Sequence, residues 1–270
     1  MDNLYFLTAG VPLKAKDYES GFKVLDEMNL DGLELEFVRG VRISDKSREV
    51  VGSSNKVITA HAPFYVNLNA REEEKVEASI QRIIETAETA NSLGGYSITF
   101  HAGFYLGNEK EIVYNQIRSQ IEIITKTLEK TNNKIWIRPE TTGKATQWGD
   151  LEEIVNLSKE FPTVLPCVDF SHLHARYNGI SNTYDEFAGI FEKIGNELGQ
   201  YALDNFHAHI AGIEYGAKGE KKHLNLEESD FNYKDLLKAF KSFNIKGAIV
   251  CESPNIEDDA KLMKEYYLGL

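Results

Sequence analysis

The sequence contains only two cysteines, Cys167 and Cys251, among its 270 residues. Each falls within an apolar run typical of a buried strand, so we expect reduced thiols in the core and no disulfide framework. The N-terminus has no basic segment followed by an apolar stretch, and no apolar run approaches the roughly 20 residues needed to span a bilayer. We therefore expect a soluble, cytoplasmic protein that does not enter a membrane, and a monomer.

Positive charge is also scarce. The chain has 30 Lys and Arg against 42 Asp and Glu, which gives a net charge of −12. This balance shows no bulk preference for nucleic acid, and a DNA partner would require a local basic strip. Bound divalent cations would neutralise part of the acidic charge, so the net charge alone excludes little.

Eight short apolar runs predict strands that are buried on both faces, as in a parallel sheet. The predicted strands are Leu4–Thr8, Gly32–Glu36, Val57–His61, Ser97–His101, Lys134–Ile137, Val164–Asp169, Phe206–His209 and Gly247–Glu252. Between them lie predicted helices over Tyr18–Met28, Arg71–Leu93, Glu109–Asn132, Asp150–Lys159, Tyr233–Phe243 and Ile256–Tyr267. Without a Pro- or Ser-rich linker, this alternation predicts an α/β fold, a (β/α)8 TIM barrel in one domain over residues 1–270.

The histidines are not scattered. All seven fall at or just beyond the carboxyl ends of these strands, and none lies in a predicted helix. The active site of such barrels lies at this end of the strands. Imidazoles and carboxylates gathered there are typical of a multi-metal site. The strand-end residues are His61, His101, Glu140, Asp169, His172, His209 and Glu252.

Some of these positions allow two interpretations. Glu140 could bridge two cations about 3.5–4 Å apart through its two oxygens, or it could form an ion pair with Arg138 or Lys144. In Phe206-His207-Ala208-His209 both imidazoles face the same side of a strand. His209 is nearer the strand end and is the favoured ligand, whereas His207 is a supporting or core histidine.

Two further histidines follow less regular segments. His174 is interpreted as facing substrate or as exposed. His223 is placed in a loop that covers residues 215–223.

The ordered set resembles the endonuclease IV family of apurinic/apyrimidinic endonucleases, within the wider group of xylose-isomerase-like TIM barrels. The resemblance runs from the second strand to Glu252, over nearly the whole chain. It rests on His61, His101, Glu140, Asp169-x-x-His172, His209, His223 and Glu252-Ser253-Pro254. It implies a zinc-dependent hydrolase that cleaves the DNA backbone 5′ to an abasic sugar in base excision repair, although the same ligands also suit Mn²⁺ and Fe²⁺.

Carried over residue by residue, the resemblance assigns the ligands of three zinc ions. His61 and His101 would hold the first ion, and Glu140, also the catalytic carboxylate, would bridge to the second. Asp169, His209 and Glu252 would complete the second ion, and His172 and His223 would hold the third.

The chain departs from the family at the third ion. The family has an Asp two residues before the loop histidine, and this chain has Lys221 there. Glu220 could substitute only if the loop shifts, so the sequence predicts two tightly held ions.

The resemblance also suggests residues that contact DNA. Arg39 and Arg42 would hold phosphate, and Phe64 and Tyr65 would wedge beside the unpaired site. The metals would generate the nucleophile from water, and no Ser or Cys nucleophile is needed.

Two rival functions remain open. A metal-dependent sugar or sugar-phosphate isomerase or epimerase would use a single cation, held by Glu140, Asp169, His209 and Glu252. The additional histidines then have no purpose, which favours the nuclease. A barrel that binds metal or ligand without catalysis is the other alternative.

Overall fold

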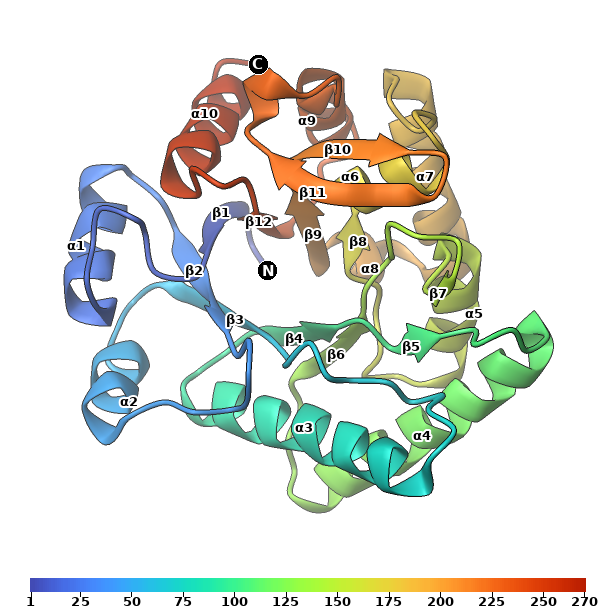
Figure 1. Ribbon diagram of the computed structural model, residues 1–270. Helices are drawn as coiled ribbons and strands as arrows, with labels where there is room; N and C mark the ends of the chain where they lie inside the picture. Colours follow the sequence, from blue (N-terminus) through green and yellow to red (C-terminus); the bar gives the residue numbers. More distant parts are fainter. The chain divides into compact units, whose positions relative to one another are not determined.

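The computed structural model describes all 270 residues, which divide into two compact units. The first unit comprises Met1–Leu33, Gly143–Ala145 and Cys167–Leu270, and the second comprises Glu34–Thr142 and Thr146–Pro166. Both alternate strands with helices along the chain (Figure 1). The expectation of one domain over residues 1–270 stays a prediction.

The second unit holds strands in the order β6-β4-β3-β2, and the pairs β3–β4 and β4–β6 are parallel. Helix α3 packs on β3 and β4 and also contacts α4 (Figure 1). The elements are β2 (Gly32–Glu36, which begins at the unit boundary), α2 (Asp45–Gly52), β3 (Val57–His61), α3 (Glu73–Ser92), β4 (Ser97–Phe100), β5 (Gly103–Phe104), α4 (Lys110–Lys130), β6 (Trp136–Pro139), β7 (Gln147–Trp148) and α5 (Leu151–Glu160).

The first unit holds strands in the order β1-β12-β9-β8, and every neighbouring pair is parallel. An antiparallel hairpin, β10–β11, follows β9 and is drawn in orange in Figure 1. The elements are β1 (Leu4–Ala9), α1 (Tyr18–Glu27), β8 (Val168–Asp169), α6 (Phe170–Arg176), α7 (Tyr184–Leu198), α8 (Gln200–Leu203), β9 (Phe206–Ile210), β10 (Gly212–Gly216), β11 (Gly219–Leu224), a 3₁₀ turn (Leu226–Glu228), α9 (Tyr233–Ser242), β12 (Gly247–Cys251) and α10 (Glu257–Leu268).

Most predicted strands are confirmed, because buried parallel strands leave nearly continuous apolar runs. The bounds of β2 and β3 match the prediction, and all five residues of β9 and of β12 are buried. The strand predicted over Val164–Asp169 is wrong in its first half. Val164 forms only an isolated bridge to Ile137, and Pro166 cannot donate a ladder hydrogen bond.

Helices α5 and α7 begin at residues whose side chains cap the helix N-terminus. The predicted N-cap of α5 is confirmed: the Asp150 side chain accepts from the backbone N–H of Glu152, and the Glu153 carboxylate accepts from the N–H of Asp150. The same capping box at Thr183 and Glu186 begins α7, a helix that we did not predict.

The core of the first unit contains a cluster of phenylalanines around Phe170 of α6. Its ring centroid lies 5.9 Å from that of Phe187, 5.7 Å from that of Phe191 and 5.8 Å from that of Phe240. All four rings are fully buried. Tilted and edge-to-face pairs of this kind stabilise a core beyond the apolar area that they bury.

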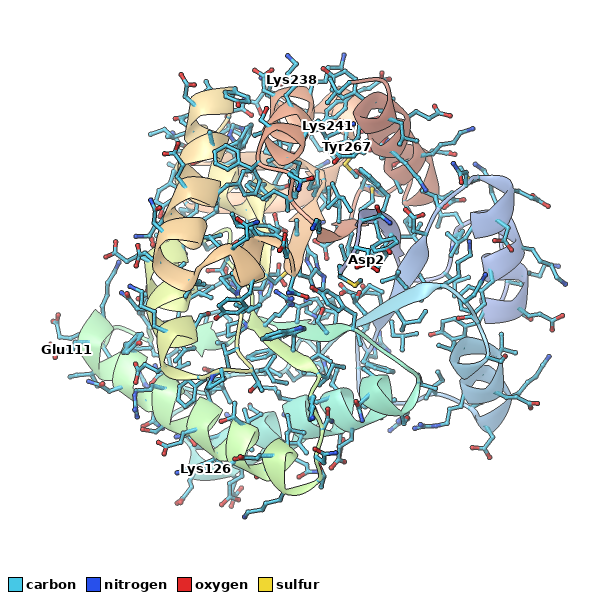
Figure 2. The ribbon with its side chains drawn as sticks, turned by 180° about the vertical axis from the view of Figure 1, so that it is seen from behind. Asp2, Glu111, Lys126, Lys238, Lys241 and Tyr267 are labelled. Carbon is cyan, nitrogen blue, oxygen red and sulfur yellow. The ribbon has the colours of Figure 1, made fainter.

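The outer faces of the helices are charged. Figure 2 shows Glu111 and Lys126 pointing away from α4, and Lys241 of α9 beside Tyr267 of α10. The Lys241 ammonium lies 4.6 Å from the centroid of the Tyr267 ring. None of the helices combines the length and the apolar character that a membrane span requires.

We predict that Phe170→Ala lowers the free energy of unfolding by about 3–5 kcal/mol, because it leaves a cavity among packed rings. Ile180→Ala is the control, because that side chain is 59% exposed and its truncation should cost less than about 0.5 kcal/mol. Urea unfolding followed by circular dichroism measures both. A cost below about 1 kcal/mol for Phe170→Ala would show that the cluster does not support the fold.

Candidate metal-binding clusters

The second unit brings together His61, His101 and Glu140, which we call the first cluster. His61 ends β3, and His101 and Glu140 directly follow β4 and β6. The Nε2 atom of His61 lies 3.2 Å from Oε2 of Glu140, and Nε2 of His101 lies 3.2 Å from Oε1. Each carboxylate oxygen therefore faces one imidazole, and the ligand atoms of the three residues lie within 4.8 Å of one another.

Parallel pairing produces this geometry. His61 is paired with Thr99, and Phe100 with Pro139, so the three side chains follow neighbouring strands at their carboxyl ends. The N–H of Glu140 continues the ladder by donating to the carbonyl of Phe100 at 3.0 Å.

Glu140 carries a buried charge that requires compensation. Its side chain is 1% exposed, that of His61 7% and that of His101 34%. Burial alone lowers the pKa of His61, but the hydrogen bond and charge of Glu140, with the charges of Glu36 and Glu34, raise that pKa to about 10. The two imidazoles thus face the carboxylate and contribute to its stabilisation.

The first cluster fits a divalent metal ion. Two imidazoles and a carboxylate are common ligands of zinc. The Nδ1 atom of His61 lies 2.7 Å from the carbonyl of Ala62, so an Nδ1–H donates there and Nε2 is left toward Glu140. Metal-binding histidines are usually oriented by such a hydrogen bond. Arg138, an alternative partner considered for Glu140, donates to the carbonyl of Pro166 and to the Tyr96 hydroxyl.

Two carboxylates near the first cluster were missed from the sequence. Glu34 and Glu36 lie two residues apart on β2, and their charges act on His61. Glu34 is fully buried and accepts a 2.7 Å hydrogen bond from Thr59. The signal was present: acids at alternate positions of an apolar strand point to one side of it.

The first unit holds a second cluster, formed by Asp169, His209 and Glu252. Asp169 of β8 is paired with His209 of β9, and Glu252 directly follows β12. The Nδ1 atom of His209 lies 3.3 Å from Oε1 of Glu252. The ligand atoms lie within 4.8 Å of one another. Asp169 and His209 are fully buried, whereas the Glu252 side chain keeps 15% exposure and is less buried than expected.

Asp169 also belongs to a third cluster, with His172 and His223. It caps α6 by accepting from the N–H of His172 at 2.7 Å, and its other oxygen lies 3.1 Å from Nδ1 of that imidazole. The rings of His172 and His223 are 5.6 Å apart. No histidine lies in a helix predicted from the sequence, but the cap at Asp169 begins α6, a helix that we did not predict and that contains His172.

The expected loop around His223 is a hairpin. His223 lies on β11, where it is paired with Ile213 of β10. The register then shifts by one residue, so Glu220 is paired with Tyr215. Because directly paired residues point to the same side, this bulge turns Glu220 to the face that carries His223.

The bulge changes what we expect at the third cluster, where this chain has Lys221 in place of the Asp of the endonuclease IV family. Oε2 of Glu220 lies 3.6 Å from Nε2 of His172, so a carboxylate is beside the third cluster without a shift of the chain. Lys221 faces away, with its ammonium 3.2 Å from Glu214. The substitution of Lys for Asp in the sequence therefore does not leave this cluster without a nearby acid.

His174 is neither exposed nor among these clusters. It is fully buried, and its Nε2 lies 3.2 Å from Asp230, which also accepts from the Tyr215 hydroxyl at 2.7 Å. That hydrogen bond, with burial and the Asp230 charge, raises the pKa of Tyr215 to about 12. The network ties the hairpin to α6.

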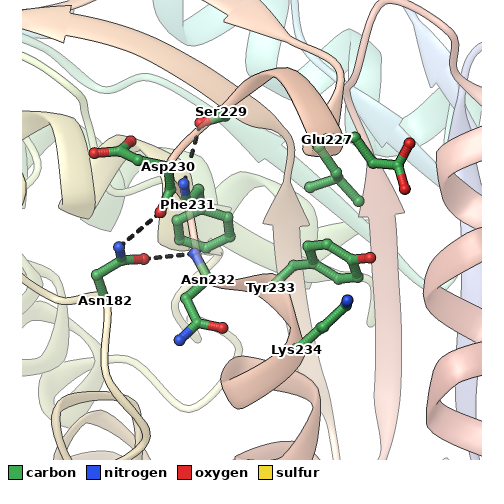
Figure 3. Close-up of a pocket in the computed structure, with 9 residues that line it drawn as sticks. Asn182, Glu227, Ser229, Asp230, Phe231, Asn232, Tyr233 and Lys234 are labelled. Carbon is green, nitrogen blue, oxygen red and sulfur yellow. Dashed lines mark hydrogen bonds between the residues drawn. The ribbon is translucent and has the colours of Figure 1, made fainter.

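Asp230 also lines a pocket of about 690 Å³ (Figure 3). Asn182 organises its wall by donating to the Asp230 carbonyl and accepting from the N–H of Asn232. None of the predicted site residues lines this pocket.

The predicted substrate contacts are all on the surface of the second unit. Phe64 and Tyr65 are 67% and 64% exposed, and the Phe64 ring lies 6.2 Å from the His61 ring. Both aromatic residues line a pocket of about 560 Å³. Arg39 and Arg42 are exposed.

The raised pKa of His61 predicts how the stability of metal-free protein depends on pH. The pKa rises from 6.5 to about 10 on folding, so this contribution is fully present below pH 6.5 and is lost as pH rises toward 10. The difference in unfolding free energy between wild type and His61→Asn should therefore shrink over that range. Urea unfolding in the presence of a chelator measures it. A constant or growing difference would contradict the assignment.

The position of Glu220 predicts the number of tightly held metal ions. Glu220→Gln should lower that number by one, because the third cluster loses the carboxylate beside His172 and keeps only that of Asp169. Lys221→Gln is the matched control and should change nothing, because Lys221 faces Glu214. Elemental analysis after dialysis against a weak chelator gives the count. Equal counts for wild type and Glu220→Gln would exclude Glu220 as a ligand.

Comparison with known proteins identifies the family of this chain and several similar proteins. Residues 22–266 match the family described as xylose isomerase-like TIM barrel. An uncharacterized protein of Methanocaldococcus jannaschii is 48% identical over 266 residues, which cover 98% of this chain and 97% of that protein. A probable endonuclease 4 of Malacoplasma penetrans is 25% identical, covering 69% of this chain and 71% of its own length.

A solved D-tagatose 3-epimerase-like protein has a TM-score of 0.76 at 21% identity, covering 98% of this chain and 97% of its own. At this identity the likeness concerns the fold alone. The predicted fold class is confirmed, and the chain belongs to the xylose isomerase-like TIM barrel family.

Proposed function

We propose that this protein is a metal-dependent phosphodiesterase that cleaves DNA 5′ to abasic sites. The observation that supports it is the number of clustered imidazoles. His61 and His101 belong to the first cluster, and His172 and His223 belong to the third cluster. The second cluster is present in addition to these two. A single-cation enzyme has no use for these four histidines, whereas phosphodiester cleavage uses several cations. The similarity to a probable endonuclease 4 points the same way.

The three clusters would hold divalent cations, which in bound form act as Lewis acids and lower the pKa of water. Zn²⁺ suits these imidazole and carboxylate donors, and Mn²⁺ or Fe²⁺ can use the same ligands. Glu140 fixes the geometry of the first cluster through both of its oxygens. The hydrogen bond from His61 to the Ala62 carbonyl keeps Nε2 aimed at the site.

Recognition of DNA would rest on the exposed surface near His61. Phe64 and Tyr65 present large aromatic faces to solvent, and bases stack on such faces. Arg39 and Arg42 would neutralise phosphates locally, which a chain with a net charge of −12 requires. A cytoplasmic location and a monomeric state remain part of this proposal.

A second candidate is a metal-dependent sugar or sugar-phosphate epimerase or isomerase. The acids on β2 favour it, because Glu34 and Glu36 add negative charge beside His61. Negative charge there opposes a phosphodiester and a sugar phosphate alike, so within this candidate it favours an uncharged sugar. This candidate would use Glu140, Asp169, His209 and Glu252 and leave the other histidines without a role.

Incubation with a duplex that carries one synthetic abasic site tests the proposal. The zinc-loaded protein should nick the strand on the 5′ side. Glu140→Gln should lower the rate of cleavage by at least roughly 100-fold. A decrease of this size is typical when one group that stabilises the transition state is removed. Glu214→Gln is a surface carboxylate control and should keep activity.

The same preparations should be incubated with a panel of ketohexoses. An intact abasic duplex at high enzyme excess would reject the nuclease. If sugars were epimerised under those conditions, the second candidate would replace it.

A further inference from the structure

Another group of donors lies in the first unit, deeper along the same two strands as Asp169 and His209. Cys167 directly precedes β8, and His207 lies on β9 two residues before His209. Val168 is paired with Ala208 and Asp169 with His209, so Cys167 is next to His207 in this parallel register. Side chains two residues apart on a strand point to one side.

The three side chains converge. The Cys167 sulfur and one nitrogen each of His207 and His209 lie within 4.8 Å of one another. The two imidazole rings are 5.2 Å apart and nearly perpendicular. All three side chains are fully buried. We call this group the inner cluster.

The donor chemistry of the inner cluster differs from that of the other three. Those clusters combine imidazoles with carboxylates, whereas the inner cluster combines two imidazoles with one thiol and contains no oxygen ligand. Thiolate and imidazole select soft or borderline cations such as Zn²⁺, Cd²⁺ and Cu⁺ over Mg²⁺, Ca²⁺ or Mn²⁺. The negative charge of a thiolate would also offset much of the cost of burying a cation.

We propose that Cys167, His207 and His209 form a further binding site for a soft d¹⁰ cation, which shares His209 with the second cluster. The site has three protein ligands, as in zinc sites that keep a fourth position open. It does not depend on which reaction the protein catalyses. Because His209 belongs to both the inner and the second cluster, a cation in one competes for an imidazole with a cation in the other. This consequence rests on the proposed function: soft metals would inhibit catalysis by displacing the cation of the second cluster.

Cadmium titration of chelator-treated protein tests this site. A Cd²⁺–thiolate bond gives charge-transfer absorption in the ultraviolet, which imidazole and carboxylate ligands do not give. Wild type should show this absorption, which should reach a plateau that corresponds to one cadmium-bound thiolate per chain. Cys167→Ser should abolish it, and His207→Gln should weaken cadmium binding at least about tenfold. His207 is not part of the other clusters, so His207→Gln should retain their metals.

Cys251→Ser is the matched control. Cys251 is the other fully buried thiol, its pKa is raised by burial to about 12, and it belongs to no group of metal ligands. This variant should keep the cadmium absorption. Circular dichroism confirms that each variant is folded, and His207→Gln decides the question if Cys167→Ser does not fold. Absent absorption in wild type, absorption that survives in Cys167→Ser, or unchanged affinity in His207→Gln would overturn the site.

Discussion

The first cluster depends on one buried carboxylate held between two imidazoles. Taking an isolated carboxylate out of water costs several kcal/mol unless a positive charge or hydrogen-bond donors compensate for it. Glu140 is almost fully buried and has an imidazole on each oxygen. Metal-free protein meets this requirement with a proton, which explains the raised pKa of His61. A divalent cation would meet it better, and binding it would release that proton.

The first unit also contains a buried carboxylate whose charge requires compensation. Asp169 is fully buried and serves three purposes: it caps α6, faces His172 and lies beside His209. A short helix that begins directly at a strand end thus brings the main-chain N–H and the imidazole of His172 to one carboxylate, and the neighbouring strand β9 adds His209. Because Asp169 belongs to both the second and the third cluster, few elements are needed to supply their ligands. The β10–β11 bulge then adds Glu220 to the same neighbourhood.

Much of this could be predicted from the sequence because buried parallel strands leave a strong signal. The run Val57–His61 has no polar interruption except Thr59, and its bounds are those of β3. The prediction failed where structure depends on the register between two strands, which the apolar pattern of a single strand does not reveal. The bulge that turns Glu220 exists only in the pairing of β10 with β11.

Other features that we did not predict have local signals in the sequence, which the apolar periodicity alone does not include. The capping box at Thr183 marks the start of α7, and the cap at Asp169 marks α6. Glu34 and Glu36 also have a local signal, because the two acids lie two residues apart within an apolar strand. Proline explains the remaining error, since Pro166 interrupts an apolar run that otherwise reads as one strand.

Anomalous diffraction from crystals grown with zinc, recorded on both sides of the zinc absorption edge, tests the central claim most directly. We expect one peak about 2.0–2.2 Å from nitrogen atoms of His61 and His101 and an oxygen of Glu140. We expect another at Asp169, His209 and Glu252. A map with no peak at Glu140, and with both imidazoles still hydrogen-bonded to its carboxylate, would contradict the account.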